Sequence, residues 1–446
     1  MAHLRSLGYI ISSYLDDLLL LGFTFQDCAH NVEETAKLFT ALGFIIHSEK
    51  SIFTPKTLIE FLGFIIDSIS MTVKPTLHKC QTIRKMINDL LKSKTMTLRV
   101  LSTIIGKLVA LIPGNTYALL YVKNLEYFRN KLLRKHKGNY EAKITLDKSC
   151  RKDLYWWVMN IDRHPKAIQS PTFEEILETD ACTSIGWGSW FKGVRTGGIW
   201  DTREREWNIN VLELLAAKLS LQSFCKNMSN INILIKTDST TVIGCVNKMG
   251  STKPLLNKIT RDIWEFAISH NIFIAATYIP GVKNIRADSE SRNKTYFETE
   301  WSLHTDTFER VNKVFGPFDI DLMASRLNAK IDPYVSWRSD PNSKFCNAFL
   351  LNDWSIYFSY CFPPFNQINK VLQKVIQDKC DMCIIVPRWT AQAFWPVLTK
   401  LLVKTPLVLQ WRKDLLTNPV LKEQNHPLII KKQLTLLACL ISGKNM

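Results

Sequence analysis

Ile176-Leu177-Glu178-Thr179-Asp180 is the stretch that decides the fold, because it predicts a strand that ends on an acid. Residues 185–190, Ile-Gly-Trp-Gly-Ser-Trp, predict the returning strand of a hairpin. Downstream, the apolar run 231–237 predicts another strand, and Asp238 follows it directly. Helical segments separate these strands, so we expect a mixed sheet with helices packed on it.

Two further acids lie at the starts of predicted helices. Residues 208–217 predict a helix with Asn210 as its N-cap and Glu213 at the third helical position. Asp288 follows a loop that contains Pro280-Gly281, and it opens another polar helix. The sequence therefore alternates strand ends and helix starts, and each of them carries an acid.

The order of the four acids favours one shared site. Alone, Glu213 has an ordinary interpretation as a capping-box acid, Asp238 as a helix N-cap, and the other two as turn residues. Together they would gather negative charge at one rim of the sheet, which costs free energy unless cations compensate it. Mg²⁺ or Mn²⁺ suits such a site, because Mg²⁺ prefers oxygen ligands and keeps waters that can attack a phosphate. We therefore predict that the metal ligands and catalytic residues are Asp180, Glu213, Asp238 and Asp288.

Four short motifs around these acids resemble the ribonuclease H domain of reverse transcriptases. They are Thr179-Asp180-Ala181, Glu213-Leu214-Leu215-Ala216, Thr237-Asp238-Ser239 and Ala287-Asp288-Ser289-Glu290-Ser291-Arg292, in that family's order. The resemblance implies that two metal ions hydrolyse the RNA strand of an RNA–DNA hybrid, with Glu213 helping to orient the attacking water. One departure is that the loop 278–284 lacks the mobile His that the family often has before its last acid.

A second acidic feature lies near the N-terminus. Residues 8–22 predict two strands around a tight turn, with Tyr14-Leu15-Asp16-Asp17 at the tip. An ordinary Asp-Asp turn is one interpretation. The tip also resembles the Tyr-x-Asp-Asp hairpin of reverse transcriptase palm domains, which implies catalytic roles for both aspartates, metal binding by Asp16 and nucleic-acid contact by Tyr14.

The residues after this hairpin agree with the palm resemblance. Residues 32–42 predict a helix, 43–46 a strand, and 61–67 a hairpin that resembles the primer grip. Two-metal phosphoryl transfer also requires an acid from an earlier strand and fingers that hold the nucleotide, yet only fifteen residues precede Asp16. We expect an N-terminally truncated chain that does not polymerise DNA, with RNA-directed DNA polymerase activity confined to a longer parent protein.

Residues 75–137 have helical periodicity and end in a basic cluster. A thumb that follows a nucleic-acid backbone is the functional interpretation, because Lys and Arg gain affinity by releasing counterions from phosphates. A solvated helical face is the alternative. Residues 149–162 predict a connecting helix, whose Trp156-Trp157 pair is expected to pack rather than stack on bases. The predicted nucleic-acid contacts in the thumb are Lys131, Arg134, Lys135 and Lys137.

From Phe318 onward, alternating strands and helices predict an α/β layer with a parallel sheet. We expect a strand followed by a turn at 318–325, a helix at 367–377 and a buried strand at 382–387. The turn Phe362-Pro363-Pro364-Phe365 resembles the loop of adenine-N6 DNA methyltransferases, which makes Pro363, Pro364 and Phe365 weak candidates for cofactor binding. Phe362 stands where that family has Asn or Asp, and no Gly-rich loop is present, so we do not expect S-adenosylmethionine to bind.

The composition of the chain indicates which class of partner and which cellular compartment to expect. The chain has 57 Lys and Arg against 40 Asp and Glu, a formal net charge of +17, which favours a polyanionic partner. A solvated basic surface is the alternative, and charge alone does not decide between the two. Eleven irregularly spaced cysteines fit a reducing compartment, and Cys380-x-x-Cys383 is a lone pair with little support for a zinc or redox role. No apolar run reaches the roughly 18 residues of a spanning helix. We expect an intracellular location, in the nucleus or cytoplasm.

The order of the segments resembles the polyprotein of DIRS-like retrotransposons and implies a multidomain chain of α/β and α+β parts. The expected domains are the C-terminal part of a reverse transcriptase palm at 1–74, a helical thumb or connection at 75–148, a connector at 149–172, a ribonuclease H-like domain of mixed sheet and helices at 173–296, a linker at 297–316 and a degenerate methyltransferase-like α/β domain at 317–446.

Three functional hypotheses follow from these segments. The first is a retroelement-derived endonuclease of the ribonuclease H type, acting on an RNA–DNA hybrid or another nucleic acid. The second is a catalytically inactive relic that still binds nucleic acid through its basic surface. The third is a DNA adenine methyltransferase. No membrane partner is expected, and the sequence does not predict an oligomeric state.

Overall fold

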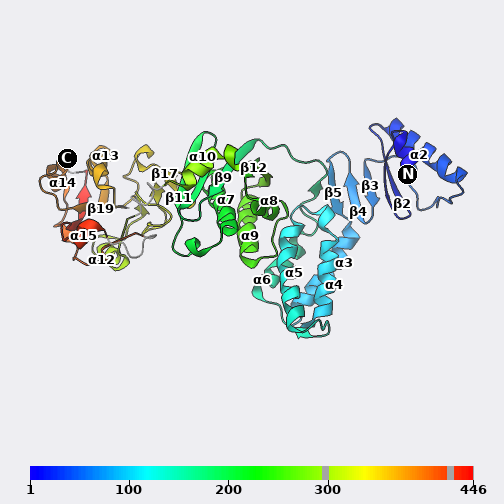
Figure 1. Cartoon of the computed structure of the whole chain (residues 1–446), viewed down its shortest axis with the longest axis horizontal. Helices are drawn as coiled ribbons and strands as arrows, with labels where there is room; N and C mark the ends of the chain where they lie inside the picture. The colour runs from blue at the N-terminus through cyan, green and yellow to red at the C-terminus, as the bar shows by residue number, and fades with distance from the viewer. Residues whose placement is uncertain (294–300, 419–425, 445–446) are drawn as a thin grey trace. The chain divides into compact units, whose positions relative to one another are not determined.

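The computed structural model describes residues 1–293, 301–418 and 426–444, and the chain divides into two compact units, Met1–Pro171 and Thr172–Met446 (Figure 1). Each unit is described by itself. The expected domain limits inside the units stay predictions. Among the described residues, no helix is both long enough and apolar enough to span a membrane.

The first unit begins with the helix α1 (Ala2–Ser6) and the predicted acidic hairpin. Strands β1 (Ile10–Tyr14) and β2 (Asp17–Leu21) pair antiparallel, with Tyr14 opposite Asp17, so Leu15 and Asp16 form the turn. Leu15 adopts a positive φ of 51° there. The hairpin is followed by α2 (Phe25–Ala41), which Thr24 caps by accepting a hydrogen bond from the Asp27 amide.

The predicted strand at 43–46 is wrong. Gly43 has a φ of 85°, which lets the chain reverse at the end of α2. The Phe44 amide then donates to the Phe39 carbonyl over 2.9 Å, and the two rings pack with centroids 5.1 Å apart. These contacts close the helix end, so the apolar residues that resembled a strand do not join a sheet.

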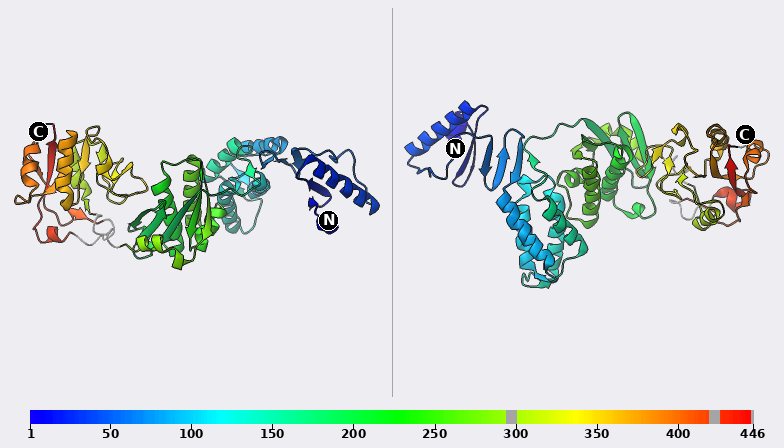
Figure 2. Two further views of the ribbon diagram at one scale, coloured as in Figure 1. Left: turned by 90° about the horizontal axis from the view of Figure 1, so that it is seen from above. Right: turned by 180° about the vertical axis from the view of Figure 1, so that it is seen from behind.

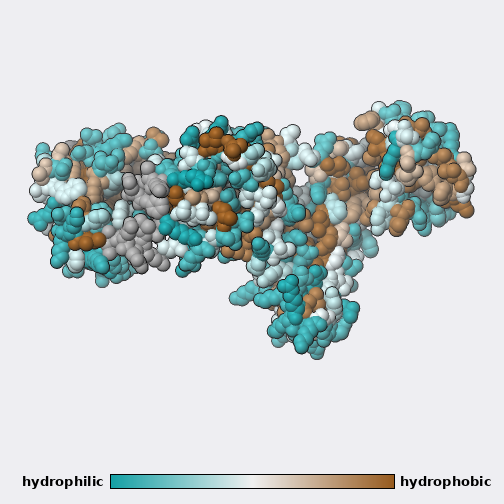
Figure 3. All heavy atoms as spheres, viewed as in Figure 1, coloured by the Kyte–Doolittle hydropathy of each residue, from teal (hydrophilic) through white to brown (hydrophobic). Residues whose placement is uncertain are grey.

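Few apolar side chains are buried in residues 1–56. Leu4 and Ile11 are the buried hydrophobic residues of this segment, whereas Phe23 and Ile45 are more than 90% exposed at 92% and 98%. Figure 3 shows apolar atoms, in brown, on the face of this part of the first unit. The segment therefore owes little of its stability to hydrophobic burial.

A four-stranded antiparallel sheet follows in the order β3-β4-β5-β8. Its strands are β3 (Leu58–Phe61), β4 (Phe64–Asp67), β5 (Thr72–Pro75) and β8 (Lys166–Ala167). Leu62 and Gly63 make the turn between the first two strands, both with positive φ. The predicted hairpin at 61–67 is thus confirmed, although its first strand begins earlier.

Four helices form most of the rest of the first unit. Three of them agree with the periodicity of residues 75–137, and the fourth confirms the connecting helix predicted at 149–162. Trp157 is fully buried and donates through Nε1 to the Tyr121 carbonyl, while Trp156 stacks on the Tyr121 ring at 3.8 Å. The tryptophan pair therefore packs inside the protein, as predicted. The elements are α3 (Leu77–Lys92), β6 (Met96–Thr97), α4 (Leu98–Val109), the 3₁₀ turn η1 (Ile112–Gly114), α5 (Ala118–Lys135), β7 (Lys143–Ile144) and α6 (Lys148–Asn160).

The second unit begins with a five-stranded mixed sheet in the order β11-β10-β9-β12-β13, drawn in green in Figures 1 and 2. Strand β9 pairs antiparallel with β10 and parallel with β12, which in turn pairs parallel with β13. The mixed sheet predicted from the acidic stretch is therefore present. The strands are β9 (Glu175–Ala181), β10 (Gly186–Phe191), β11 (Val194–Ile199), β12 (Ile231–Thr237) and β13 (Ile272–Tyr278).

Four helices accompany this sheet: α7 (Ile209–Cys225), α8 (Thr240–Asn247), α9 (Pro254–Ser269) and α10 (Ile285–Ser291), with 3₁₀ turns η2 (Glu204–Glu206) and η3 (Gly281–Lys283). The predicted N-cap of the first helix is wrong, because Asn208 rather than Asn210 accepts the hydrogen bond from the Val211 amide. Asn210 lies inside the helix, where its Oδ1 accepts from the Thr241 hydroxyl.

The C-terminal part contains a second five-stranded sheet, in the order β15-β18-β19-β22-β20. The first three strands are parallel, and β22 runs antiparallel to both of its neighbours. The expected α/β layer is therefore present, with a buried strand where 382–387 predicts one. The strands are β15 (Ile320–Asp321), β18 (Ser359–Cys361), β19 (Asp381–Pro387), β20 (Leu407–Val408) and β22 (Leu436–Ser442).

Helix α13 (Ile368–Asp378) packs the apolar stripe Ile368, Val371, Leu372 and Val375 onto this second sheet's core. Its bounds agree with the predicted helix at 367–377 to within one residue. The expected linker at 297–316 lies partly outside the described residues, and its described part contains α12 (Thr305–Phe315). The remaining elements are β14 (Ser302–Leu303), β16 (Val335–Ser336), β17 (Phe345–Cys346), η4 (Ala348–Leu350), η5 (Phe365–Gln367), α14 (Trp395–Leu401), β21 (Leu416–Thr417) and α15 (Pro427–Ile430).

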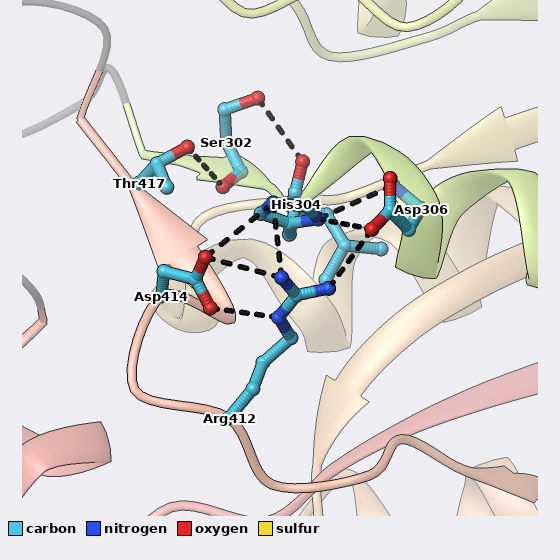
Figure 4. Close-up of polar contacts among 7 residues, drawn as sticks. Ser302, His304, Asp306, Arg412, Asp414 and Thr417 are labelled. Atoms are coloured by element: carbon cyan, nitrogen blue, oxygen red, sulfur yellow. Dashed lines mark hydrogen bonds and ion pairs between the residues drawn. The ribbon is translucent and has the colours of Figure 1, made fainter.

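A polar cluster that the sequence did not predict joins the start of α12 to the loop before β21 (Figure 4). His304 caps the helix by accepting from the Asp306 amide through Nδ1. Arg412 donates through Nε to Asp414 over 2.7 Å and pairs with Asp306 at 3.4 Å. These side chains hold together two segments about a hundred residues apart, beside the β14–β21 pair.

Candidate metal centre

Three of the four predicted acids meet at one edge of the mixed sheet. Asp180 lies one residue before the end of β9, Asp238 follows β12, and Glu213 projects from α7. One oxygen of each lies within 4.8 Å of the others. Strands β9 and β12 are parallel neighbours, so their carboxyl ends meet, and α7 packs on β9 and supplies the third acid. In the part of the chain that the structure describes, this is the group of three that could hold a metal ion.

Asp288 is the fourth predicted acid and lies beside this group rather than within it. It is in the first turn of α10, and its charge acts on Asp180. Its Oδ1 accepts a 2.7 Å hydrogen bond from Nε of Arg292 in an ion pair. The structure therefore places all four acids in one neighbourhood, with Asp288 on the more exposed side.

Two buried polar side chains fix α10 against the sheet. Asn284 donates through Nδ2 to the Thr179 carbonyl at 3.0 Å, and Ser291 donates through Oγ to Asp180 Oδ2 at 2.6 Å. Both side chains are fully buried. They position the strand that carries Asp180 and the helix that carries Asp288, and the sequence assigned neither residue a role. A polar residue at each end of a short helix was the available signal.

The local structure removes the ordinary interpretations of the acids. Glu213 is the fifth residue of α7, not the third, so it cannot close a capping box with the N-cap Asn208. Ser239, not Asp238, caps α8 by accepting from the Val242 amide. Asp180 pairs within a strand, and Asp288 lies inside a helix, so neither is a turn residue.

Burial and mutual repulsion make two of the acids, Glu213 and Asp180, reluctant to ionise. Glu213 is 7% exposed, and burial, followed by the charges of Asp180 and Asp238, raises its pKa to about 9. Burial also raises the pKa of Asp180 to about 6, against the lowering effect of the Ser291 hydrogen bond. Such shifts mean that the ionised cluster lacks compensation from the protein itself.

A hard divalent cation fits the residues present. The donors are all carboxylate oxygens, which suit Mg²⁺ or Mn²⁺ better than a metal that prefers sulfur or imidazole. Glu213 Oε2 is buried and has no hydrogen-bond partner among the described residues, so it is available as a ligand. The cation would also supply the positive charge that the buried carboxylates need.

The N-terminal acids are not brought into a comparable group. Tyr14 and Asp17 face each other across the β1–β2 hairpin, Asp16 lies in its turn, and all three are exposed. Within the described ranges, no third acid, His or Cys joins the two aspartates to make a metal site. The hairpin that the sequence predicted is present, and its catalytic and nucleic-acid roles stay predictions.

The predicted basic contacts lie at the end of the thumb-like helices. Lys131, Arg134 and Lys135 occupy the last turns of α5, and Lys137 follows the helix with a positive φ of 49°. All four side chains are exposed. They are therefore accessible to a polyanion, and their binding role stays a prediction.

Two of the three C-terminal candidates are packed, whereas Pro364 is exposed. Pro363 is buried between β18 and α13, and the Phe365 ring packs edge-on against Trp389 with centroids 5.2 Å apart. Cys380 and Cys383 are free and buried, and they join no group of three metal ligands in the described part of the chain. The packing of Phe365 gives no support to cofactor binding at this turn.

Similarities to known proteins were found for the sequence and for the fold, although no family model matches the chain. The chain is 28% identical over 296 residues to the enzymatic polyprotein of cauliflower mosaic virus (strain NY8153), covering 63% of this chain and 40% of that protein. It is 26% identical over 306 residues to the enzymatic polyprotein of figwort mosaic virus (strain DxS), with the same coverage of 63% and 40%. The chain thus spans about 40% of the length of these relatives.

Solved structures with partial likeness include the foamy viral protease-reverse transcriptase in complex with RNA/DNA hybrid, at 15% identity, a TM-score of 0.34 and coverage of 63% of this chain and 37% of that one. Another is ribonuclease H1 from the halophilic archaeon Halobacterium salinarum NRC-1, at 17% identity, a TM-score of 0.23 and coverage of 26% of this chain and 92% of that one.

The sequence similarities, the mixed sheet and its acidic centre support a retroelement-type protein of the reverse transcriptase and ribonuclease H class. These observations do not show that the chain belongs to the DIRS-like group, so that assignment stays a prediction. They also give no support to the methyltransferase-like assignment of the C-terminal domain.

Proposed function

We propose that this chain hydrolyses the RNA strand of RNA–DNA hybrids with two divalent metal ions held by Asp180, Glu213, Asp238 and Asp288. The observation that carries the proposal is the convergence of Asp180, Glu213 and Asp238 to within 4.8 Å at the carboxyl edge of two parallel strands. The net charge of +17 supports a polyanionic substrate. The DIRS-like origin belongs to the same proposal, because it rests on the order of the sequence motifs.

The protein's own residues would act as follows. Divalent ions, when bound, supply an activated water and charge neutralisation at the scissile phosphate. Asp180 is held in orientation by the Ser291 hydroxyl, which donates to its Oδ2. Glu213 accepts from the Ala181 backbone and keeps Oε2 free, so that it can coordinate a metal ion and orient a water. The loop 278–284 contains no His, so proton transfer at product release falls to other groups.

Two other activities are not proposed for this chain. DNA polymerisation would require a third acid beside Asp16 and Asp17, and the described residues place none there. Methyl transfer would require an acceptor for the target amine, and Phe362 occupies that position of the turn. We expect no transfer of a labelled methyl group to DNA, and no change in that result for Pro364→Ala.

The hydrolysis is tested with the full chain and a labelled RNA–DNA hybrid in Mg²⁺ or Mn²⁺. Asp180→Asn should reduce RNA cleavage by at least about 100-fold, because even a change outside the ligands of a metal site costs roughly 10–100-fold. Asp89→Asn, at an exposed position of α3, is the matched control and should cleave like the wild type.

The same experiment separates the nuclease from an inactive binder. Metal-dependent cleavage that disappears with EDTA and with Asp180→Asn supports hydrolysis. Salt-sensitive binding of the hybrid without any cleavage above the Asp180→Asn level contradicts it and leaves a nucleic-acid-binding relic.

A further inference from the structure

Arg292 occupies a position that distinguishes Asp288 from the other three acids. It directly follows α10, four residues after Asp288, and its Nε lies 2.7 Å from Asp288 Oδ1. Asp180 instead accepts from a hydroxyl, and Glu213 from a backbone amide. Among the described residues, Asp288 is thus the one acid of the four with an ion-pair partner.

The ion pair between Arg292 and Asp288 can open easily. The Arg292 and Asp288 side chains are 61% and 40% exposed. Water therefore screens their attraction, and the ion pair is weak. Arg292 lies just beyond the last residue of α10, and its side chain is long. Its guanidinium can therefore leave Asp288 without moving α10. By contrast, the Asn284 and Ser291 contacts that hold the helix are buried and would stay in place.

We propose that Arg292 is an internal counter-cation that competes with a divalent ion for Asp288 and thereby raises the metal concentration that the site requires. The proposal rests on the proposed function, because it takes Asp288 as a metal ligand. A guanidinium and a divalent ion repel each other and seek the same carboxylate oxygen, so binding of one disfavours the other. Removing the guanidinium should therefore strengthen metal binding, although it lies outside the ligand set.

Arg286 provides a matched comparison on the same helix. Its guanidinium carbon lies 4.1 Å from the centre of the Trp190 ring, so it is anchored by a cation–π contact and not by an acid of the site. Arg286→Ala removes the same charge from α10 and leaves the Asp288 pair intact. It separates a direct competition at Asp288 from a general effect of positive charge near the cluster.

The test measures Mn²⁺ binding to the full chain by calorimetric titration and by the electron paramagnetic resonance of the free ion, without nucleic acid. Arg292→Ala should bind Mn²⁺ about two- to fivefold more tightly than the wild type, the range expected for loss of one exposed ion pair. Arg292→Lys keeps the charge without the guanidinium. Its Mn²⁺ affinity should lie between that of the wild type and that of Arg292→Ala. Arg286→Ala should change the affinity less than Arg292→Ala does.

The Asp288→Asn background tells where the effect originates. There, Arg292→Ala should no longer alter Mn²⁺ affinity, because the carboxylate charge for which both cations compete has gone. Unchanged or weaker Mn²⁺ binding by Arg292→Ala, or an equal gain with and without Asp288, would overturn the counter-cation. If the wild type fails to cleave the hybrid yet Arg292→Ala still tightens Mn²⁺ binding, hydrolysis is contradicted and the counter-cation stands.

Discussion

At the scale of single residues, Glu213 shows how a ligand position conflicts with folding. The side chain is buried on α7, where it must lie to reach Asp180 and Asp238, and burial disfavours its charged form. A divalent cation bound as proposed would resolve the conflict. Without one, the conflict should be measurable as a dependence of stability on pH.

Glu213→Gln should stabilise the metal-free protein increasingly as the pH rises. The pKa of this carboxyl is about 9 in the folded chain against 4.5 when unperturbed, so the folded state holds a proton that the unfolded state has lost between these values. The free energy of unfolding of the wild type therefore falls as pH rises from about 4.5 towards 9, and Gln removes this loss. Because one pKa unit is about 1.4 kcal/mol, we expect a gain of roughly 2–5 kcal/mol at pH 9.

Urea unfolding with EDTA at pH 5, 7 and 9 measures this difference. At pH 5 the two proteins should be nearly equally stable, because the wild-type carboxyl is then protonated in the folded state and partly so in the unfolded one. A stability difference that is constant across the three pH values would show that Glu213 titrates normally.

At the scale of elements, the close approach of α10 to β10 depends on Gly188. A Cβ at this position would lie 2.1 Å from the Ala287 carbonyl oxygen and 2.3 Å from the Ser291 nitrogen. Both atoms belong to the backbone, so they can move only if the helix moves. The helix carries Asp288, and thus one glycine on a strand sets the position of an acid a hundred residues later.

Gly188→Ala should push α10 away from β10 and weaken the metal centre. We expect a loss of about 1–3 kcal/mol in the free energy of unfolding, the usual cost of overpacking, and weaker Mn²⁺ binding. Gly244→Ala is the control, because a Cβ there meets no atom within 4 Å and lies in α8, where Ala is favoured. Urea unfolding and Mn²⁺ titration of both variants decide the matter, and equal behaviour of the two would contradict the role given to Gly188.

At the scale of the whole second unit, a buried ion pair joins the mixed sheet to the C-terminal part. Arg326 donates to both Glu204 oxygens, at 2.8 and 3.0 Å, and to the Ile199 carbonyl at the end of β11. The Arg326 and Glu204 side chains are 13% and 10% exposed. Lys226 adds hydrogen bonds to the Asp340 carbonyl and to Ser343. The edge strand of the mixed sheet is therefore covered by residues from far along the chain.

Arg326→Ala should destabilise the protein by about 3–5 kcal/mol, because it leaves Glu204 buried without its partner. Arg412→Ala removes the more exposed pairs with Asp414 and Asp306, and each should cost less than about 1 kcal/mol. Thermal or urea unfolding of the full chain compares the two variants. The double variant Arg326→Met with Glu204→Met should recover much of the lost stability. Equal losses for Arg326→Ala and Arg412→Ala would show that the buried pair stabilises the protein no more than the exposed contacts of Arg412 do.

The sequence by itself determined the local elements and the placement of the acids upon them. Strand periodicity, turn residues and the alternation of strand ends with helix starts are local signals, and they suffice to assign Asp180, Glu213 and Asp238 to one edge of the sheet. The same local signals misplaced the N-cap at Asn210 and the strand at 43–46, because a side-chain contact elsewhere decided each case.

Only the tertiary structure decided which residues far apart in the sequence meet. The Ser291 bond to Asp180, the Gly188 approach to α10 and the Arg326–Glu204 pair each join residues about a hundred positions apart. Such contacts depend on how elements pack, and no periodicity or spacing along the chain encodes the distance between two side chains that meet only after folding.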